Sequence, residues 1–147
     1  MSLDIRQELK SILSAITYTG KDGVERSINV YLETDANDKG QLRFTTPALV
    51  IRAFVNRNAP ATVNWAYWEE YADLDVSLYL SARSDVYEPE AVRKEVTAKV
   101  EELIKAYKTG TGPALSLQLI ETKDRDDLER RGTLRRDFTI RAWRAGP

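Results

Sequence analysis

The fold is decided by residues 73–107, where a strand pattern is followed directly by a helix pattern. The first part reads DLDVSLYL from Asp73 to Leu80 and alternates strictly between polar and apolar residues. Such alternation is typical of a strand with one face buried and the other in water. The second part reads PEAVRKEVTAKVEELIKAY from Pro89 to Tyr107, and its apolar residues recur every three or four positions. It predicts an amphipathic helix with Pro89 in its first turn.

The first strand has two distinct faces, and its start is open. It could begin further back, near Tyr67 or Glu69. The apolar face holds Leu74, Val76, Leu78 and Leu80, and the polar face holds Asp73, Asp75, Ser77 and Tyr79. The helix is opened by Ser84–Pro89 and stopped by Gly110, Gly112 and Pro113.

Two further strands are predicted after the helix, at residues 115–121 and 133–143. The connection from Lys123 to Gly132 is highly charged, which suits a hairpin tip. In the last strand the inner face is predicted to hold Leu134, Arg136, Phe138, Ile140 and Ala142, and the outer face Arg135, Asp137, Thr139, Arg141 and Trp143.

The N-terminal third is less uniform. A helix is predicted from about Leu3 to Ile16, with Ser2 as a candidate N-cap. The secondary structure of residues 18–42 is the least determined by the sequence. Gly20–Gly23 is a turn signal, and 27–32 is a candidate short strand. Residues 33–41 are polar and are expected to form a loop or a flexible arm. A strand follows at Pro47–Val55, with Leu49, Ile51, Ala53 and Val55 on one side, and then a loop at 56–62.

These elements combine into an α+β fold. We expect strands 47–55 and 73–80, and strands 115–121 and 133–143, to pair as antiparallel neighbours. The result is a two-layer sandwich, in which an N-terminal helix and one long helix between the strand pairs cover a mainly antiparallel four-stranded sheet. The chain is expected to form a single domain over 1–147, with a polar loop or arm at about 33–46.

Composition excludes several kinds of chemistry. The chain of 147 residues has neither His nor Cys, and its formal net charge is −1. Zinc sites built on Cys and His, thiol nucleophiles and disulfides are therefore impossible. No catalytic constellation stands out, and no cofactor is expected. The weak enzyme candidate is a divalent-metal site at Asp73 and Asp75, although charges on a solvated sheet face explain these residues more simply.

The strand pair at the C-terminus carries a local excess of positive charge. Residues 123–144 contain eight basic and five acidic residues, while the rest of the chain is slightly acidic. Because the acids are interleaved, we expect cross-strand ion pairs or a subunit contact here, and no nucleic-acid binding. No apolar run approaches the length of a membrane span. A cytoplasmic location is expected.

Aromatic residues crowd into one short segment beside a loop. Trp65, Tyr67, Trp68 and Tyr71 fall within seven positions, next to Glu69 and Glu70. Aromatics are enriched in interface cores. The alternative is that some of them complete the hydrophobic core.

In layout, the chain resembles the small tail terminator, or tail completion, proteins of long-tailed bacteriophages and prophages. The matching pieces are Asp4–Ile16, the Thr46-Pro-Ala-Leu-Val-Ile51 strand start, Leu74–Leu80, Val92–Tyr107, and the closing pair 115–119 with 135–143. The resemblance rests on element order and hydrophobic pattern.

The resemblance implies a non-enzymatic structural protein. Members of this family form a ring, commonly a hexamer, that caps the tail tube and joins it to the head connector. The implied location is the virion tail, after assembly in the cytoplasm. Head-to-tail contacts need two different patches. The candidates are the aromatic segment and the basic hairpin, with the residues Trp65, Tyr67, Trp68, Tyr71, Arg125, Arg130, Arg131, Arg135, Arg141 and Trp143. A small protein-binding adaptor remains the alternative function.

Overall fold

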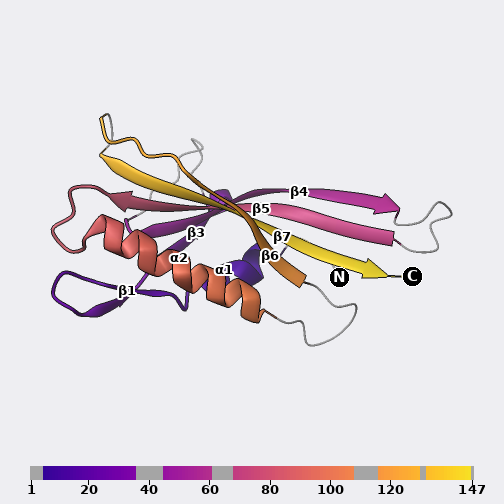
Figure 1. Cartoon of the computed structure of the whole chain (residues 1–147), viewed down its shortest axis with the longest axis horizontal. Coiled ribbons are helices and arrows are strands. Elements are labelled where there is room, and N and C mark those ends of the chain that lie inside the picture. The colour runs from indigo at the N-terminus through magenta and orange to yellow at the C-terminus, as the bar shows by residue number, and fades with distance from the viewer. Residues whose placement is uncertain (1–4, 36–44, 61–67, 108–115, 130–131, 147) are drawn as a thin grey trace.

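A single mixed sheet organises the protein, as a computed structural model shows (Figure 1). The structure describes residues 5–35, 45–60, 68–107, 116–129 and 132–146. The sheet has five strands in the order β3-β4-β5-β7-β6. Their bounds are β3 Asn29–Leu32, β4 Ala48–Pro60, β5 Trp68–Ser81, β6 Ser116–Asp124 and β7 Thr133–Gly146. The α+β class is therefore confirmed.

The predicted antiparallel neighbours are confirmed, but the sheet is larger than predicted. β4 pairs antiparallel with β5, and β6 with β7. β5 and β7 form the centre over fourteen register pairs, from Trp68↔Gly146 to Ser81↔Thr133. The short candidate strand at 27–32 joins this sheet as β3, parallel to the start of β4. The predicted sheet of four antiparallel strands therefore lacked one strand, the parallel edge strand β3.

Strand β4 runs further than predicted. Residues 56–60, expected to be a loop, continue pairing with β5 up to Pro60↔Trp68. β5 correspondingly starts at Trp68, within the range left open by the sequence. The predicted alternation of β4 fails past Ile51, because an irregularity in the register places Phe54 opposite Leu74. β4 therefore carries one extra residue here, as in a β-bulge.

Two helices cover one face of the sheet. Helix α1 spans Arg6–Leu13 and packs against β3 and β4. It is shorter than predicted at both ends, and Ile5 occupies the N-cap position, so the Ser2 cap is wrong. Helix α2 spans Pro89–Ala106 and packs against β5 and β6, and its Pro89 start is confirmed. The Glu88 carboxylate accepts the amide hydrogen of Ala91 at 2.6 Å, which caps the first turn. The predicted stop at 110–113 lies outside the described residues.

A small hairpin occupies part of the undecided N-terminal region. Strands β1 (Thr17–Thr19) and β2 (Glu25–Ser27) form a separate two-stranded sheet. Gly23 has φ of 79° in the connecting turn, a left-handed conformation that favours glycine. The hairpin is tied to α2, since Glu95 accepts hydrogen bonds from the amide and hydroxyl of Thr19. Residues Glu33–Asp35 form a short 3-10 helix, η1. Residues 36–44 of the predicted arm lie outside the described residues.

The hydrophobic core lies between the helices and the inner face of the sheet. The helices bury Leu9, Leu13, Val92, Val96, Val100 and Ile104, and the central strands bury Leu74, Val76, Leu78, Leu80, Leu134, Phe138, Ile140 and Ala142. The predicted inner faces of β5 and β7 are thereby confirmed. Among the described residues, no helix is long and apolar enough to cross a membrane.

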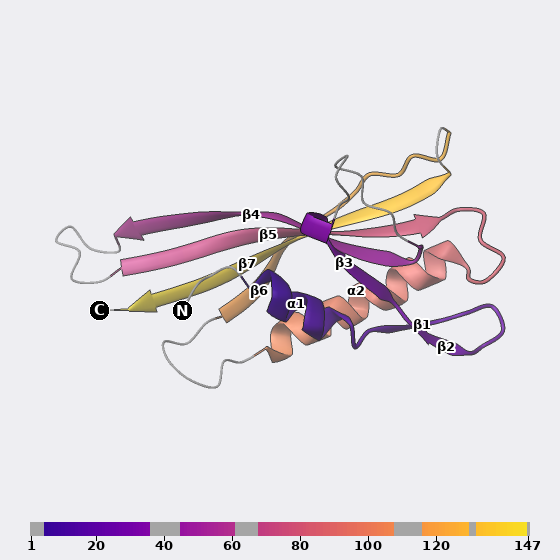
Figure 2. The same cartoon turned by 180° about the vertical axis from the view of Figure 1, so that it is seen from behind.

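The sheet extends beyond the helices. Seen from both sides, β4, β5 and β7 continue together past the ends of α1 and α2 (Figures 1 and 2). The outermost register row of this extension joins Pro60, Trp68 and Gly146. The face opposite the helices therefore runs from the β6–β7 hairpin to the end of the extension, and this face carries the polar residues.

Candidate functional site

A ladder of cross-strand polar pairs crosses the face opposite the helices. The predicted outer residues of β5 and β7 lie directly opposite one another in the register. From the extension toward the hairpin, the pairs are Asp73↔Arg141, Asp75↔Thr139, Ser77↔Asp137 and Tyr79↔Arg135. Directly opposed residues on one face are the pairs that interact most strongly in a sheet. In each of the four pairs the two side chains are hydrogen-bonded or stacked on one another, so their contacts hold the polar side chains of this face in place.

The pair nearest the extension combines charge and aromatic contact. Arg141 donates from Nε to one carboxylate oxygen of Asp73 at 2.8 Å and from a terminal nitrogen to the other at 3.2 Å. The guanidinium carbon also lies 4.3 Å from the centre of the Tyr71 ring. Tyr71 is itself opposite Trp143, whose exposed fraction is 37%. Tyr71, Arg141 and Trp143, three of the predicted interface residues, are thus brought together.

Asp137 organises the end nearest the hairpin. Its carboxylate accepts hydrogen bonds from the Ser77 hydroxyl at 2.7 Å and from Arg135 Nε at 2.8 Å, and Arg125 Nε lies 2.9 Å away. Partial burial alone would raise the pKa of Asp137. The hydrogen bonds from Arg135 and Ser77 outweigh this effect and hold its pKa below the ordinary value. Asp137 therefore stays ionised at neutral pH and fixes two guanidinium groups in place.

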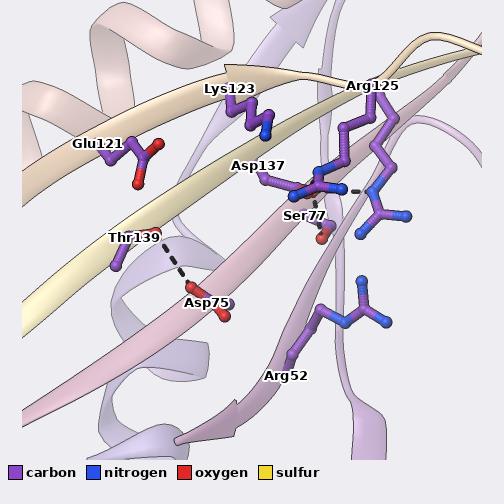
Figure 3. Close-up of a pocket in the computed structure, with 9 residues that line it drawn as sticks. Arg52, Asp75, Ser77, Glu121, Lys123, Arg125, Asp137 and Thr139 are labelled. Atoms are coloured by element: carbon purple, nitrogen blue, oxygen red, sulfur yellow. Dashed lines mark hydrogen bonds and ion pairs between the residues drawn. The ribbon is translucent and has the colours of Figure 1, made fainter.

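A groove of about 500 Å³ lies on this face and crosses strands β4, β5, β7 and β6 (Figure 3). It is lined by Arg52, Asp75, Ser77, Glu121, Lys123, Arg125, Arg135, Asp137 and Thr139. The groove lies beside two β-bulges at the same level of the sheet. One is the extra residue of β4 between Ile51 and Phe54, and the other is an extra residue of β6 between Leu119 and Glu121. Bulges bend a strand and re-aim its side chains, and here both flank the Asp75–Thr139 pair.

The sequence did not single out Arg52, Glu121, Lys123 or Ser77 as site residues. Glu121 and Lys123 lie an even number of positions from Leu119, so simple alternation would put them on the inner face. The bulge reverses this, placing Glu121 opposite Thr139 and Lys123 opposite Asp137. A single sequence gives no signal for a bulge at this position, since no glycine marks it.

The aromatic segment is only partly described. Tyr71 lies on the polar face, half-buried against Arg141. Trp68 begins β5, where the backbone alone is described. Trp65 and Tyr67 lie outside the described residues. The prediction that this segment forms an interface is therefore carried by Tyr71 and by its neighbour Trp143.

The basic hairpin divides between two sides of the sheet. Arg125 and Arg135 face the groove, as described above. Arg136 points to the helix side, where it forms a bidentate pair with Asp124 at 2.6 and 3.0 Å. Arg130 and Arg131 lie outside the described residues. The ion pairs within the hairpin and to its neighbours correspond to the cross-strand pairing that the sequence suggested.

The weak metal candidate is not favoured by the geometry. Both oxygens of Asp73 are engaged by Arg141, and Asp75 accepts the Thr139 hydroxyl at 3.1 Å. A cation at Asp73 would have to displace a guanidinium group. Within the described ranges, no group of three or more acidic, His or Cys residues is close enough to hold a metal ion.

Comparisons with known proteins do not assign the chain to a family. No protein-family model matches the sequence, and no curated protein matches it. The geometry of the polar face and the layout of the chain are therefore the features that bear on its function.

Proposed function

We propose that the protein is a non-enzymatic structural subunit that assembles through the polar face of its sheet, in the manner of a phage or prophage tail terminator. It would form a homo-oligomeric ring, as the hexamers common in that family do, that caps the tail tube and contacts the head connector. Its place would be the virion tail, after assembly in the cytoplasm. The order of helices and strands along the chain resembles that of the family, and this resemblance supports the proposal.

The observation that carries the proposal is the cluster of Tyr71, Arg141 and Trp143 on the uncovered face of the extension. Tyr, Trp and Arg are the residue types that dominate binding energy in protein interfaces. Here the guanidinium group is held over the Tyr71 ring and fixed by Asp73 before any partner arrives. Pre-organised side chains lose little conformational entropy on binding. Such a cluster favours association over catalysis.

The test is the oligomeric state and its dependence on this cluster. We expect light scattering coupled to size-exclusion chromatography to find a closed oligomer, either alone or in the presence of tail tubes, and negative-stain microscopy to find rings. Trp143→Ser should weaken association about tenfold or more, because the change removes an aromatic contact at the centre of the interface. Since Trp143 is partly exposed, the circular dichroism spectrum should stay unchanged.

A matched control is Val86→Ser. Val86 is 48% exposed and lies in the loop before α2, away from the ladder. It should associate like the parent protein. A parent protein that stays monomeric at all concentrations and ignores tail tubes would overturn the proposal. The adaptor alternative instead predicts a stable monomer or dimer with one protein partner.

A further inference from the structure

The groove on the polar face has a basic end built from three different segments of the chain. Arg52 comes from β4, Arg125 from the β6–β7 connection and Arg135 from β7. Figure 3 shows Arg52 on the opposite side of the groove from Arg125, with its guanidinium group directed toward that side. Lys123 adds a fourth cation to the lining. Long-range pairing of the strands is therefore what brings these charges together.

These cations keep free donors. Asp137 engages Arg125 and Arg135 through their Nε atoms. Within the part of the chain that the structure describes, the terminal nitrogens of these two groups have no hydrogen-bond acceptor, and neither Arg52 nor Lys123 has an ion-pair partner. A guanidinium group offers five N–H donors in a rigid fork that matches a carboxylate. The basic end therefore presents unused donors, and Asp137 holds two of its guanidinium groups in place.

The other end of the groove is acidic. Glu121 lies there, on the far side of the view from Arg52 and Arg125, whereas Asp75 lies beside the β4 bulge that contains Arg52 (Figure 3). Glu121 faces Thr139 in the register, and Thr139 is four residues from Arg135 along β7. At the rise of a strand, four residues span roughly 13 Å. The two ends are thus separated by a distance that suits two side chains of one protein segment better than the two ends of one small zwitterion.

We propose that this groove is a docking site for a protein segment that places a carboxylate side chain among Arg52, Arg125 and Arg135 and a basic side chain near Glu121. The occupant is a protein carboxylate because the groove has three acidic residues of its own, Asp75, Glu121 and Asp137. These residues repel a dianionic phosphate or a polyanion, whereas a single carboxylate followed by a cation is complementary to both ends. The inference rests on the proposed function in taking this face to be an assembly interface, and it supplies the chemistry of the partner.

The experiment is a titration followed by NMR, using the arginine Nε–Hε resonances and the backbone amides of residues 121–139. The probe is the capped peptide acetyl-Asp-Ala-Ala-Ala-Lys-amide, compared with the same peptide carrying Asn in place of Asp and with inorganic phosphate. We expect the Asp peptide to shift resonances at the groove, and the Asn peptide to bind more weakly. Added salt should weaken the binding of the Asp peptide, because the contacts are between exposed charges.

Variants test whether the Asp peptide binds at the groove. Arg52→Gln and Lys123→Gln should each weaken binding of the Asp peptide about two- to fivefold, the range for removal of one partly exposed charge. Lys94→Gln, a charge change of the same kind on the exposed side of α2, should leave binding unchanged. The fold of each variant is checked by its amide spectrum. Equal binding of the Asp and Asn peptides, tighter binding of phosphate, or the absence of any shift at the groove would each overturn the docking proposal.

The two proposals fail separately. If the protein forms rings but the groove does not bind the Asp peptide, the docking inference is wrong and the assembly function stands. If the groove binds the peptide and the protein neither forms rings nor contacts tail tubes, the assembly function is wrong.

Discussion

At the scale of single residues, Arg93 is a buried charged side chain that connects two elements of the fold. It lies on α2 with an exposed fraction of 6%. Its guanidinium group donates to Asp126 at 2.8 Å and to Glu90 at 2.6 Å, so it connects the helix to the segment between β6 and β7. Its Nε is buried with no partner among the described residues. Arg93 therefore joins α2 to the segment between β6 and β7, although one of its buried N–H groups has no acceptor among the described residues.

Arg93→Ala should destabilise the fold by about 1–3 kcal/mol. Breaking a fully buried pair costs more, but Asp126 and Glu90 are partly exposed and can be solvated after the change. Urea denaturation measures the difference. Lys94→Ala, the adjacent exposed residue, should change stability by less than about 0.5 kcal/mol. Equal stability of the two variants would contradict the structural role of Arg93.

The outer face of β5 and β7 could be predicted from the sequence at this scale, whereas its contacts could not. Alternation alone placed Asp73, Asp75, Arg135 and Arg141 on one face. The pairing of Asp73 with Arg141 depends on the register between two strands separated by α2. No local pattern specifies that register.

At the scale of elements, the long helix and the central strands were the most predictable parts. Their apolar positions follow one period over many residues, and Pro89 marks the helix start. Short or irregular elements were not predictable in the same way. β3 has only four residues and pairs parallel to β4, a contact decided by the whole fold. The far part of β4 reads as a loop because Asn56, Asn58 and Pro60 are poor strand formers.

Tyr87 links three elements and supplies a prediction at this scale. Its side chain is buried and packs edge-on against Tyr18, with ring centres 5.9 Å apart. Its hydroxyl accepts the amide hydrogen of Ser81 at 2.8 Å and donates to the Thr46 hydroxyl at 3.0 Å. It thereby joins the end of β5, the loop before α2 and the approach to β4.

Tyr87→Phe should lower the free energy of unfolding by about 1–2 kcal/mol, because the Ser81 amide loses its partner in a partly buried site. Chemical denaturation monitored by circular dichroism gives the value. The comparison is Tyr107→Phe, which removes a hydrogen bond to the exposed Glu8 and should have a smaller effect. A larger effect at Tyr107 would contradict this assignment.

At the scale of the whole molecule, carboxylates hold separate parts together. Glu95 joins the β1–β2 hairpin to α2, and Asp124 joins β6 to β7 through Arg136. The hydrogen bond from Arg136 lowers the pKa of Asp124. For Glu95, the hydrogen bonds from Thr19 lower the pKa despite the opposing effect of burial. Asp137 behaves similarly on the outer face.

Stability should therefore decrease as the solution becomes acidic. A carboxylate whose pKa is lower in the folded state stabilises the fold fully above its unfolded pKa, near 4, and this stabilisation is lost as pH falls through the folded pKa. Urea denaturation between pH 7 and pH 3 should show the loss beginning at about pH 4. Asp124→Asn should be less stable at pH 7 and lose less on acidification. A parallel decrease in both proteins would argue against Asp124 as a contributor.

The two bulges have a consequence for how this chain tolerates changes of length. Each inserts one residue, so the side chains beyond it exchange faces relative to simple alternation. Deleting one residue at 52–53 or at Ile120 would remove the bulge and leave the register partners beyond it unchanged. After deletion of Ile120, Lys123 would still lie opposite Asp137 and Asp124 opposite Arg136, so the basic lining and the ion pair would be kept. The bulges are thus points at which this chain can lose one residue without exchanging the faces of its strands.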